Sequence, residues 1–101
     1  MEKVGMKYDS EKPDYSLIPP LAQDEFVKVL TFGAKKYGRD DWKQLDDLRN
    51  RYIAAAGRHW NAMLRGEIVD PESGLLHAAH LQSCAAFLSE YQLATRMHKE
   101  V

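Results

Sequence analysis

The sequence predicts an all-α fold in which three helices follow an extended N-terminal arm. Apolar residues recur with helical spacing in three segments, prolines and glycines fall between those segments, and no stretch alternates polar and apolar residues as a strand does. The chain has 101 residues and is 45% hydrophobic, which is enough for a core in a single domain, 1–101.

Residues 1–19 are expected to form the arm. They show no sustained periodicity, and Pro13 and Pro19 each remove a backbone donor that a helix or strand would use. Tyr15 and Leu17 are among the apolar side chains that would anchor the arm on the rest of the protein. The alternative is a solvated, charged tail, chiefly over residues 1–6.

The first helix is expected over residues 20–38. Its apolar side chains from Leu21 to Tyr37 follow the helical period, and Gly38 can end it. Lys36 falls in the last turn, where a cation complements the helix dipole. That role accounts for Lys36 without a ligand, and phosphate binding is the alternative.

Trp42 stands in a charged loop between the first and second expected helices. A ring of this size must find an apolar partner or remain in water. Two interpretations are open: Trp42 plugs the end of a helical bundle, or it offers a surface on which a nucleobase stacks.

The second helix is expected over residues 47–65 and has two apolar faces. Tyr52 and His59 fall on one stripe, whereas Ile53 and Trp60 fall on another. A helix with two apolar faces packs between neighbours. Since the chain supplies only three helices, one neighbour is expected to come from a second subunit.

The third helix, the longest, is expected over residues 71–98. Asp70 can cap it, Pro71 fits the first helical position, and Glu72 adds negative charge where the helix dipole favours it. In this register His77 and His80 lie one turn apart on the same face, so both imidazoles can point at one target.

Three histidines and three carboxylates are concentrated around the turn between the second and third helices. Helical pairs of ligands three residues apart recur in the metal sites of bundles. Oxygen ligands favour Mg²⁺ or Mn²⁺, whereas imidazoles favour Zn²⁺ or another transition metal. Plainer roles stay open, namely a hydrogen-bonded core histidine and carboxylates for capping or solubility. The cluster consists of His59, Glu67, Asp70, Glu72, His77 and His80.

Composition argues against several other classes of protein. A net charge of −1 gives no overall electrostatic case for binding nucleic acid or a membrane. The single cysteine, Cys84, cannot form an internal disulfide and falls within a helical apolar pattern, as expected in a reducing cytosol. We see no signal peptide, bilayer-spanning apolar run, Gly-rich phosphate loop or paired cysteines. We therefore expect a soluble cytoplasmic protein.

Several strings occur in order along most of the chain. They are KYDSEKP (7–13), LIPP (17–20), VLTFGAKKYG (29–38), Asp41-Trp42, Arg58-His59, Gly66-Glu67, DPESG (70–74) and HAAH (77–80). Together they resemble the phage dATP/dGTP diphosphohydrolase family, an outlying relative of the all-α, MazG-like nucleoside triphosphate pyrophosphohydrolases.

The resemblance implies a three-helix MazG-like chain that completes helical bundles by homo-oligomerisation. It implies a cytoplasmic enzyme, in the host if phage-encoded, that hydrolyses purine (deoxy)nucleoside triphosphates to monophosphate and pyrophosphate with Mg²⁺ or Mn²⁺. MazG-like enzymes usually hold metal with ExxE and ExxD pairs, which this chain lacks at the corresponding places. His77 and His80 stand where the second pair would be.

On this resemblance the candidate site residues take specific roles. Expected catalytic residues are His59, Glu67, His77 and His80, and expected metal ligands are Glu67, Asp70, Glu72, His77 and His80. Lys7, Lys12, Lys36 and Arg58 would clamp phosphates, Tyr37 and Trp42 would stack on the base, and Asp9 or Asp41 would accept a hydrogen bond from its exocyclic amine.

Two other functions remain open. Because the acidic pairs are missing, the chain could bind and sequester a nucleotide or cyclic nucleotide without turnover. It could also be a small helical interaction module in which the histidines serve the core and the oligomer interface.

Overall fold

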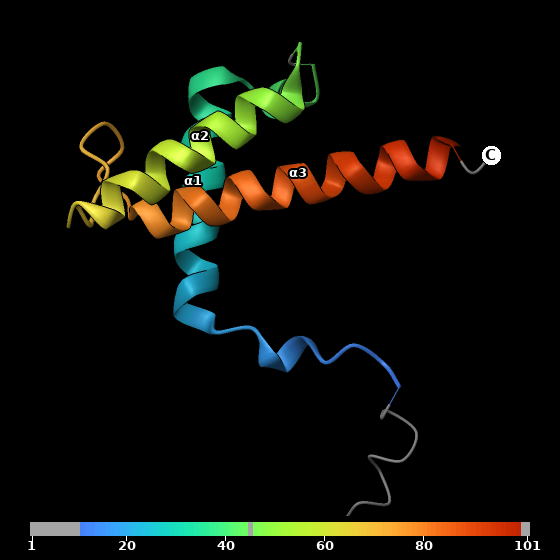
Figure 1. Ribbon diagram of the computed structural model, residues 1–101. Coiled ribbons are helices and arrows are strands. Elements are labelled where there is room, and N and C mark those ends of the chain that lie inside the picture. The colour runs from blue at the N-terminus through green and yellow to red at the C-terminus, as the bar shows by residue number, and fades with distance from the viewer. Residues whose placement is uncertain (1–10, 45, 100–101) are drawn as a thin grey trace, which may run out of the picture.

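A computed structural model of the protein describes residues 11–44 and 46–99. Over these residues the chain forms three α-helices, α1 (Pro20–Tyr37), α2 (Leu48–Leu64) and α3 (His77–Lys99), and two short 3₁₀ helices, η2 (Tyr15–Leu17) and η3 (Asp41–Gln44) (Figure 1). The described residues contain no β-strand, only an isolated bridge between Val69 and Leu76. The all-α prediction is confirmed.

Helices α2 and α3 form an antiparallel pair, and α1 crosses this pair (Figure 1). The two paired helices make the most extensive contact between elements, and α1 packs mainly against α3. The end of α2 therefore lies beside the start of α3, so residues near position 60 face residues near position 80. None of the described helices is long and apolar enough to cross a membrane.

The first two helices lie within one residue of their expected bounds. Pro20 starts α1 in the position that proline favours, and the Gly38 N–H donates to the carbonyl of Ala34 at its end, 2.9 Å away. Lys35 and Lys36 fall in the last turn of α1, as expected.

Helix α3 begins at His77, not at residue 71, so the predicted start was wrong. Residues 68–77 instead form a hydrogen-bonded loop: the Asp70 N–H donates to the carbonyl of Leu75 (2.8 Å), and the His77 N–H donates to the carbonyl of Ile68 (2.9 Å). Asp70 accepts hydrogen bonds from the Glu72 N–H (3.4 Å) and the Ser73 hydroxyl (3.0 Å). Its carboxylate thus stabilises this loop and does not cap a helix.

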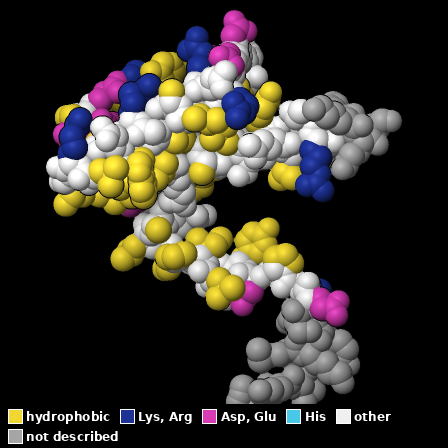
Figure 2. Space-filling view, in the orientation of Figure 1, with side chains coloured by type: hydrophobic (Ala, Val, Ile, Leu, Met, Phe, Trp, Pro, Cys, Tyr) yellow, Lys and Arg dark blue, Asp and Glu magenta, His cyan; other side chains and the backbone are white. Residues whose placement is uncertain are grey.

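The buried apolar side chains are mostly small. Val29, Leu48, Ala62, Ala79 and Cys84 make up the hydrophobic core of the described residues. Leu21, expected in the buried stripe of the first helix, is 80% exposed. The first half of α1 extends beyond the α2–α3 pair, and Figure 2 shows hydrophobic side chains uncovered along it and along the preceding arm.

Gly74 holds a conformation that the loop needs. Its φ is +74°, and the Gly74 N–H donates to the carbonyl of Asp70 at 2.8 Å. We expect Gly74→Ala to lower the free energy of unfolding by about 1–2 kcal/mol, because an alanine at positive φ is strained. Denaturant unfolding measures this change.

Gly33→Ala is the matched control. Gly33 lies within α1, and a Cβ added there meets no atom within 4 Å. This substitution should raise the free energy of unfolding by about 0.5–1 kcal/mol, because alanine loses less backbone entropy than glycine in a helix. Equal effects of the two substitutions would contradict the assigned role of Gly74.

Candidate functional site

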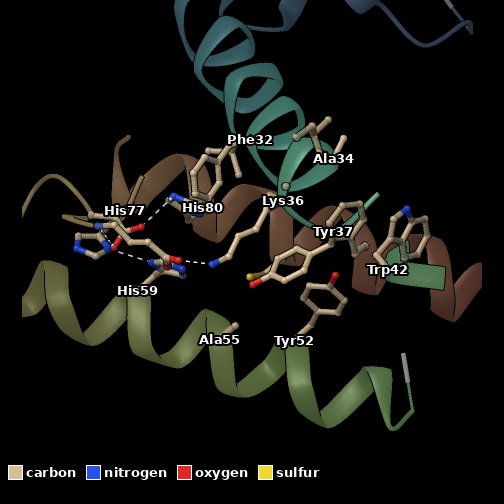
Figure 3. A pocket seen from close by; sticks show the side chains of 18 of the residues that line it. Phe32, Ala34, Lys36, Tyr37, Trp42, Tyr52, Ala55, His59, His77 and His80 are labelled. Atoms are coloured by element: carbon tan, nitrogen blue, oxygen red, sulfur yellow. Dashed lines mark hydrogen bonds and ion pairs between the residues drawn. The ribbon is translucent and has the colours of Figure 1, made fainter. Parts of the chain in front are cut away.

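A pocket of about 1190 Å³ lies between the end of α1, the η3 segment, one face of α2 and the first half of α3. Figure 3 shows that it has two chemically different ends. His59, His77 and His80 gather at one end, and Tyr37, Tyr52 and Trp42 gather at the other, with Lys36 between them. We call these the imidazole end and the aromatic end.

Two helices and one loop build the imidazole end. The ring of His59 on α2 stacks on the ring of His80 on α3, with centroids 4.6 Å apart and an interplanar angle of 7°. The Nδ1 atoms of His59 and His77 lie 2.9 Å apart. Nε2 of His77 is 2.7 Å from Oε1 of Glu67, which belongs to the loop after α2. His77 is 4% exposed, so this chain of contacts is anchored inside the protein.

The hydrogen-bond partners indicate which ring nitrogens of His77 and His59 carry a proton. A carboxylate only accepts, so Nε2 of neutral His77 carries its proton and its Nδ1 has the lone pair. Nδ1 of His59 must then donate to Nδ1 of His77. Neutral His59 is left with a lone pair on Nε2. The three residues therefore form a carboxylate–imidazole–imidazole series.

His80 belongs to a second network. Its Nε2 lies 2.7 Å from the Ser73 hydroxyl oxygen and 3.4 Å from Oδ2 of Asp70. The Ser73 hydroxyl donates to the same carboxylate oxygen at 3.0 Å and accepts from the Leu75 N–H at 3.2 Å. All these contacts are satisfied when Nε2 of His80 donates, which leaves the lone pair of neutral His80 on Nδ1.

Burial favours the neutral form of two imidazoles. Desolvation lowers the pKa of His59, and the neighbouring His80 and His77 lower it further. Desolvation likewise lowers the pKa of His80, although the Asp70 carboxylate opposes this shift. For Asp70 itself, burial acts to raise the pKa, but hydrogen bonds from Ser73 and the Glu72 N–H outweigh it and the pKa is lowered. The site thus holds neutral imidazoles beside an ionised carboxylate near pH 7.

Lys36 connects the loop to α1. Its ammonium forms an ion pair with Glu72, and this hydrogen bond raises the pKa of Lys36. The ammonium also lies 5.0 Å from the centroid of the Tyr37 ring and 5.9 Å from that of Phe32. Lys36 therefore lies between the imidazole end and the exposed ring of Tyr37.

The aromatic end is partly filled by its own side chains. Trp42 stacks on Phe87 with centroids 4.5 Å apart and an interplanar angle of 19°, and Tyr52 lies 5.2 Å from Phe87. Burial raises the pKa of Tyr52 to about 12, so its hydroxyl stays protonated. Trp42 thus packs against α3 through Phe87. Tyr37 is 62% exposed and presents an uncovered ring.

The structure brings most of the expected site residues to this pocket. It is bordered by all six cluster residues, and also by Lys36, Tyr37, Asp41, Trp42 and Arg58. Lys12 is exposed on the arm and does not border the pocket. Lys7 and Asp9 lie outside the described residues.

Sequence reasoning missed other residues that border or support the site. Ser73 was overlooked because the expected third helix included it, whereas it belongs to the loop and contacts His80. Arg51 and Arg65 also border the pocket. Their spacing of seven residues on either side of Arg58 was the signal that could have found them.

The expected metal ligands are engaged with one another. Among the residues that the structure describes, no group of three or more His, Cys, Asp or Glu side chains is arranged to hold an ion. Glu67 contacts His77, Asp70 contacts Ser73 and His80, and Glu72 pairs with Lys36. The donor types still suit a divalent cation, because Mg²⁺ commonly takes only one or two carboxylates from the protein and its other ligands from water and substrate phosphates.

Comparison with known proteins places the chain in a family. Residues 2–100 match the family model described as dATP/dGTP diphosphohydrolase, N-terminal. The chain is 38% identical over 85 residues to a dATP/dGTP diphosphohydrolase of Salmonella phage PMBT28; the match covers 84% of this chain and 29% of that relative's length. No solved structure matches the chain. The chain belongs to the dATP/dGTP diphosphohydrolase family, whose N-terminal region it matches.

Proposed function

We propose that the protein hydrolyses the purine deoxynucleoside triphosphates dATP and dGTP to the monophosphate and pyrophosphate. The observation that carries this proposal is the pocket itself: a carboxylate–imidazole–imidazole series lies at one end and an exposed aromatic ring at the other, in a chain of this family. The name of the Salmonella phage relative supports the choice of substrates.

The two ends of the pocket suggest how a nucleotide would lie. The base would stack on Tyr37, which is uncovered, while Asp41 borders the same end and can accept a hydrogen bond from an exocyclic amine. The phosphates would extend toward His59, with Arg58 able to bind two phosphate oxygens through its planar guanidinium. The bond between the α- and β-phosphates would then lie near the imidazoles.

The Glu67–His77–His59 series would handle the proton of the attacking water. The lone pair on Nε2 of His59 would accept that proton as the water oxygen attacks the α-phosphorus and the bond to pyrophosphate breaks. His77 would hold the ring of His59 in the required tautomer, and Glu67 would stabilise the positive charge that develops on the imidazoles. His80, fixed by Ser73 and Asp70, would present Nδ1 to the same space.

We propose Mg²⁺ or Mn²⁺ as the cofactor, held by a subset of Glu67, Asp70, Glu72, His77 and His80. When bound, the ion would neutralise triphosphate charge and make a coordinated water more acidic. The three carboxylates at this end give a physical reason for a cation, because they would otherwise repel the phosphates.

An assay of purified protein tests the proposal, with dATP, dGTP and the other common nucleoside triphosphates, Mg²⁺ or Mn²⁺, and EDTA as the control. Anion-exchange chromatography would resolve the products. We expect monophosphate and pyrophosphate from the purine deoxynucleotides and none with EDTA. Tight binding without turnover would instead favour a sequestering protein.

Glu67→Gln tests the proton series directly. Glutamine keeps a hydrogen-bond acceptor for His77 but removes the charge, so we expect kcat to fall by roughly 10²-fold or more with little change in KM. Glu90→Gln, on the exposed surface of α3, is the matched control and should retain wild-type kcat. Full activity of Glu67→Gln would remove Glu67 from the mechanism.

The neutral imidazoles make stability depend on pH. Because the pKa values of His59 and His80 are lowered in the folded protein from 6.5, the unfolded chain binds protons first as pH falls. The free energy of unfolding should therefore be fully developed above pH 6.5 and should decrease toward pH 5. Denaturant unfolding at several pH values measures this slope.

His80→Gln should flatten this slope, because it removes one of the groups whose pKa is lowered. Gln82→Ala, at an exposed position of α3 that carries no titratable group, is the control and should leave the slope unchanged. A slope that is the same in wild type and His80→Gln would show that His80 does not contribute to it.

We also propose that the protein assembles as a homo-oligomer through the outer face of α2. Ile53, Trp60 and Leu64 are 45%, 55% and 68% exposed, and their spacing places them on one side of the helix. An uncovered apolar stripe of this kind marks an interaction surface. The exposed apolar residues at the start of α1 add to the surface available for assembly.

Light scattering after size-exclusion chromatography tests this assembly. Wild type should elute with the mass of two or more chains, and the double variant Ile53→Ser, Trp60→Ser should shift toward the monomer. Leu93→Ser, at a 54% exposed apolar position on α3, is the matched control and should keep the wild-type mass. A monomeric wild type would contradict the proposal.

A further inference from the structure

A row of arginines follows the face of α2 that borders the pocket. Arg51, Arg58 and Arg65 are separated by seven residues each, which is close to two helical turns. In an α-helix this spacing puts successive Cα atoms about 10.5 Å apart along the axis, with their side chains on nearly the same side. Arg51 and Arg58 lie within α2, and Arg65 is its C-cap residue. All three residues border the pocket.

The charges of this row are not balanced by carboxylates. Within residues 11–44 and 46–99, none of the three guanidinium groups forms an ion pair or a side-chain hydrogen bond. Of the nearby acidic residues, Glu67 contacts His77 and Glu72 pairs with Lys36, so neither is paired with an arginine of the row. The row is thus locally cationic although the whole chain has a net charge of −1, and an anion is the ligand that it suits.

Because the three arginines lie at different positions along the pocket, each would lie beside a different part of a bound ligand. Arg58 directly precedes His59 in α2, and both residues border the pocket at the imidazole end. Arg51 precedes Tyr52 at the aromatic end, whereas Arg65 lies beyond the imidazoles, two residues before Glu67. If the base of a nucleotide stacks on Tyr37, its phosphates would reach Arg58 first and Arg65 last.

We propose that Arg65 binds the terminal phosphate of the substrate and so selects triphosphates over diphosphates. Arg58 binds the phosphates nearer the sugar, and Arg51 lies too close to the base to distinguish the two ligands. The guanidinium fork gives each contact two charge-assisted hydrogen bonds. This inference rests on the proposed function, because it assumes that the pocket binds a nucleotide in this direction.

Binding measurements with non-hydrolysable ligands test the inference. Isothermal titration calorimetry with α,β-methylene dGTP and α,β-methylene dGDP, both with Mg²⁺, compares three phosphates with two. Wild type should bind the triphosphate more tightly. Arg65→Gln should weaken triphosphate binding by about tenfold or more and leave diphosphate binding unchanged, because only the terminal phosphate loses its partner.

Two further variants complete the test. Arg58→Gln should weaken binding of both ligands, and Arg51→Gln, the matched control on the same face, should keep the preference for the triphosphate. All three arginines are exposed, so circular dichroism should show wild-type helicity in each variant.

The outcomes separate the two proposals. If Arg65→Gln keeps the full preference, or if Arg51→Gln loses it, the inference is overturned while nucleotide binding stands. If wild type binds neither ligand, the proposed function fails and this inference fails with it.

Discussion

The site depends on the way His77 is held where α2 and α3 meet. Its backbone N–H is fixed to the carbonyl of Ile68, and its buried ring lies between Glu67 and His59. One residue thus joins the loop, the start of α3 and the end of α2. Because a buried imidazole needs partners for both nitrogens, the loop and the helix pair must adopt their positions together.

Helical periodicity predicted much of the fold, for reasons visible in particular residues. Pro20 and Gly38 mark the ends of α1 through local backbone chemistry, which a sequence displays directly. The start of α3 was mispredicted because Asp70, Pro71 and Glu72 match a helix start equally well. Hydrogen bonds across the loop favour the loop over a helix at these residues. They join residues whose pairing a local sequence pattern does not reveal.

The same limit applies to the candidate site. The density of histidines and carboxylates around one turn was enough to predict that His59, His77 and His80 lie together. Their tautomers were not predictable, because they follow from contacts such as His77 with Glu67 and His80 with Ser73. The stacking of Trp42 on Phe87 was equally hidden, since these residues are far apart in the sequence.

Two buried alanines lie close in sequence to the imidazoles of the site. Ala62 and Ala79 are 4% and 3% exposed, on α2 and α3 respectively, and each is three residues or fewer from a histidine of the site. Small side chains let two helices approach closely, and protein interiors resist added volume. A larger residue at either buried position would need room that the packing of the helices does not offer, so these two small side chains are a condition for the close approach of α2 and α3 on which the imidazole end depends.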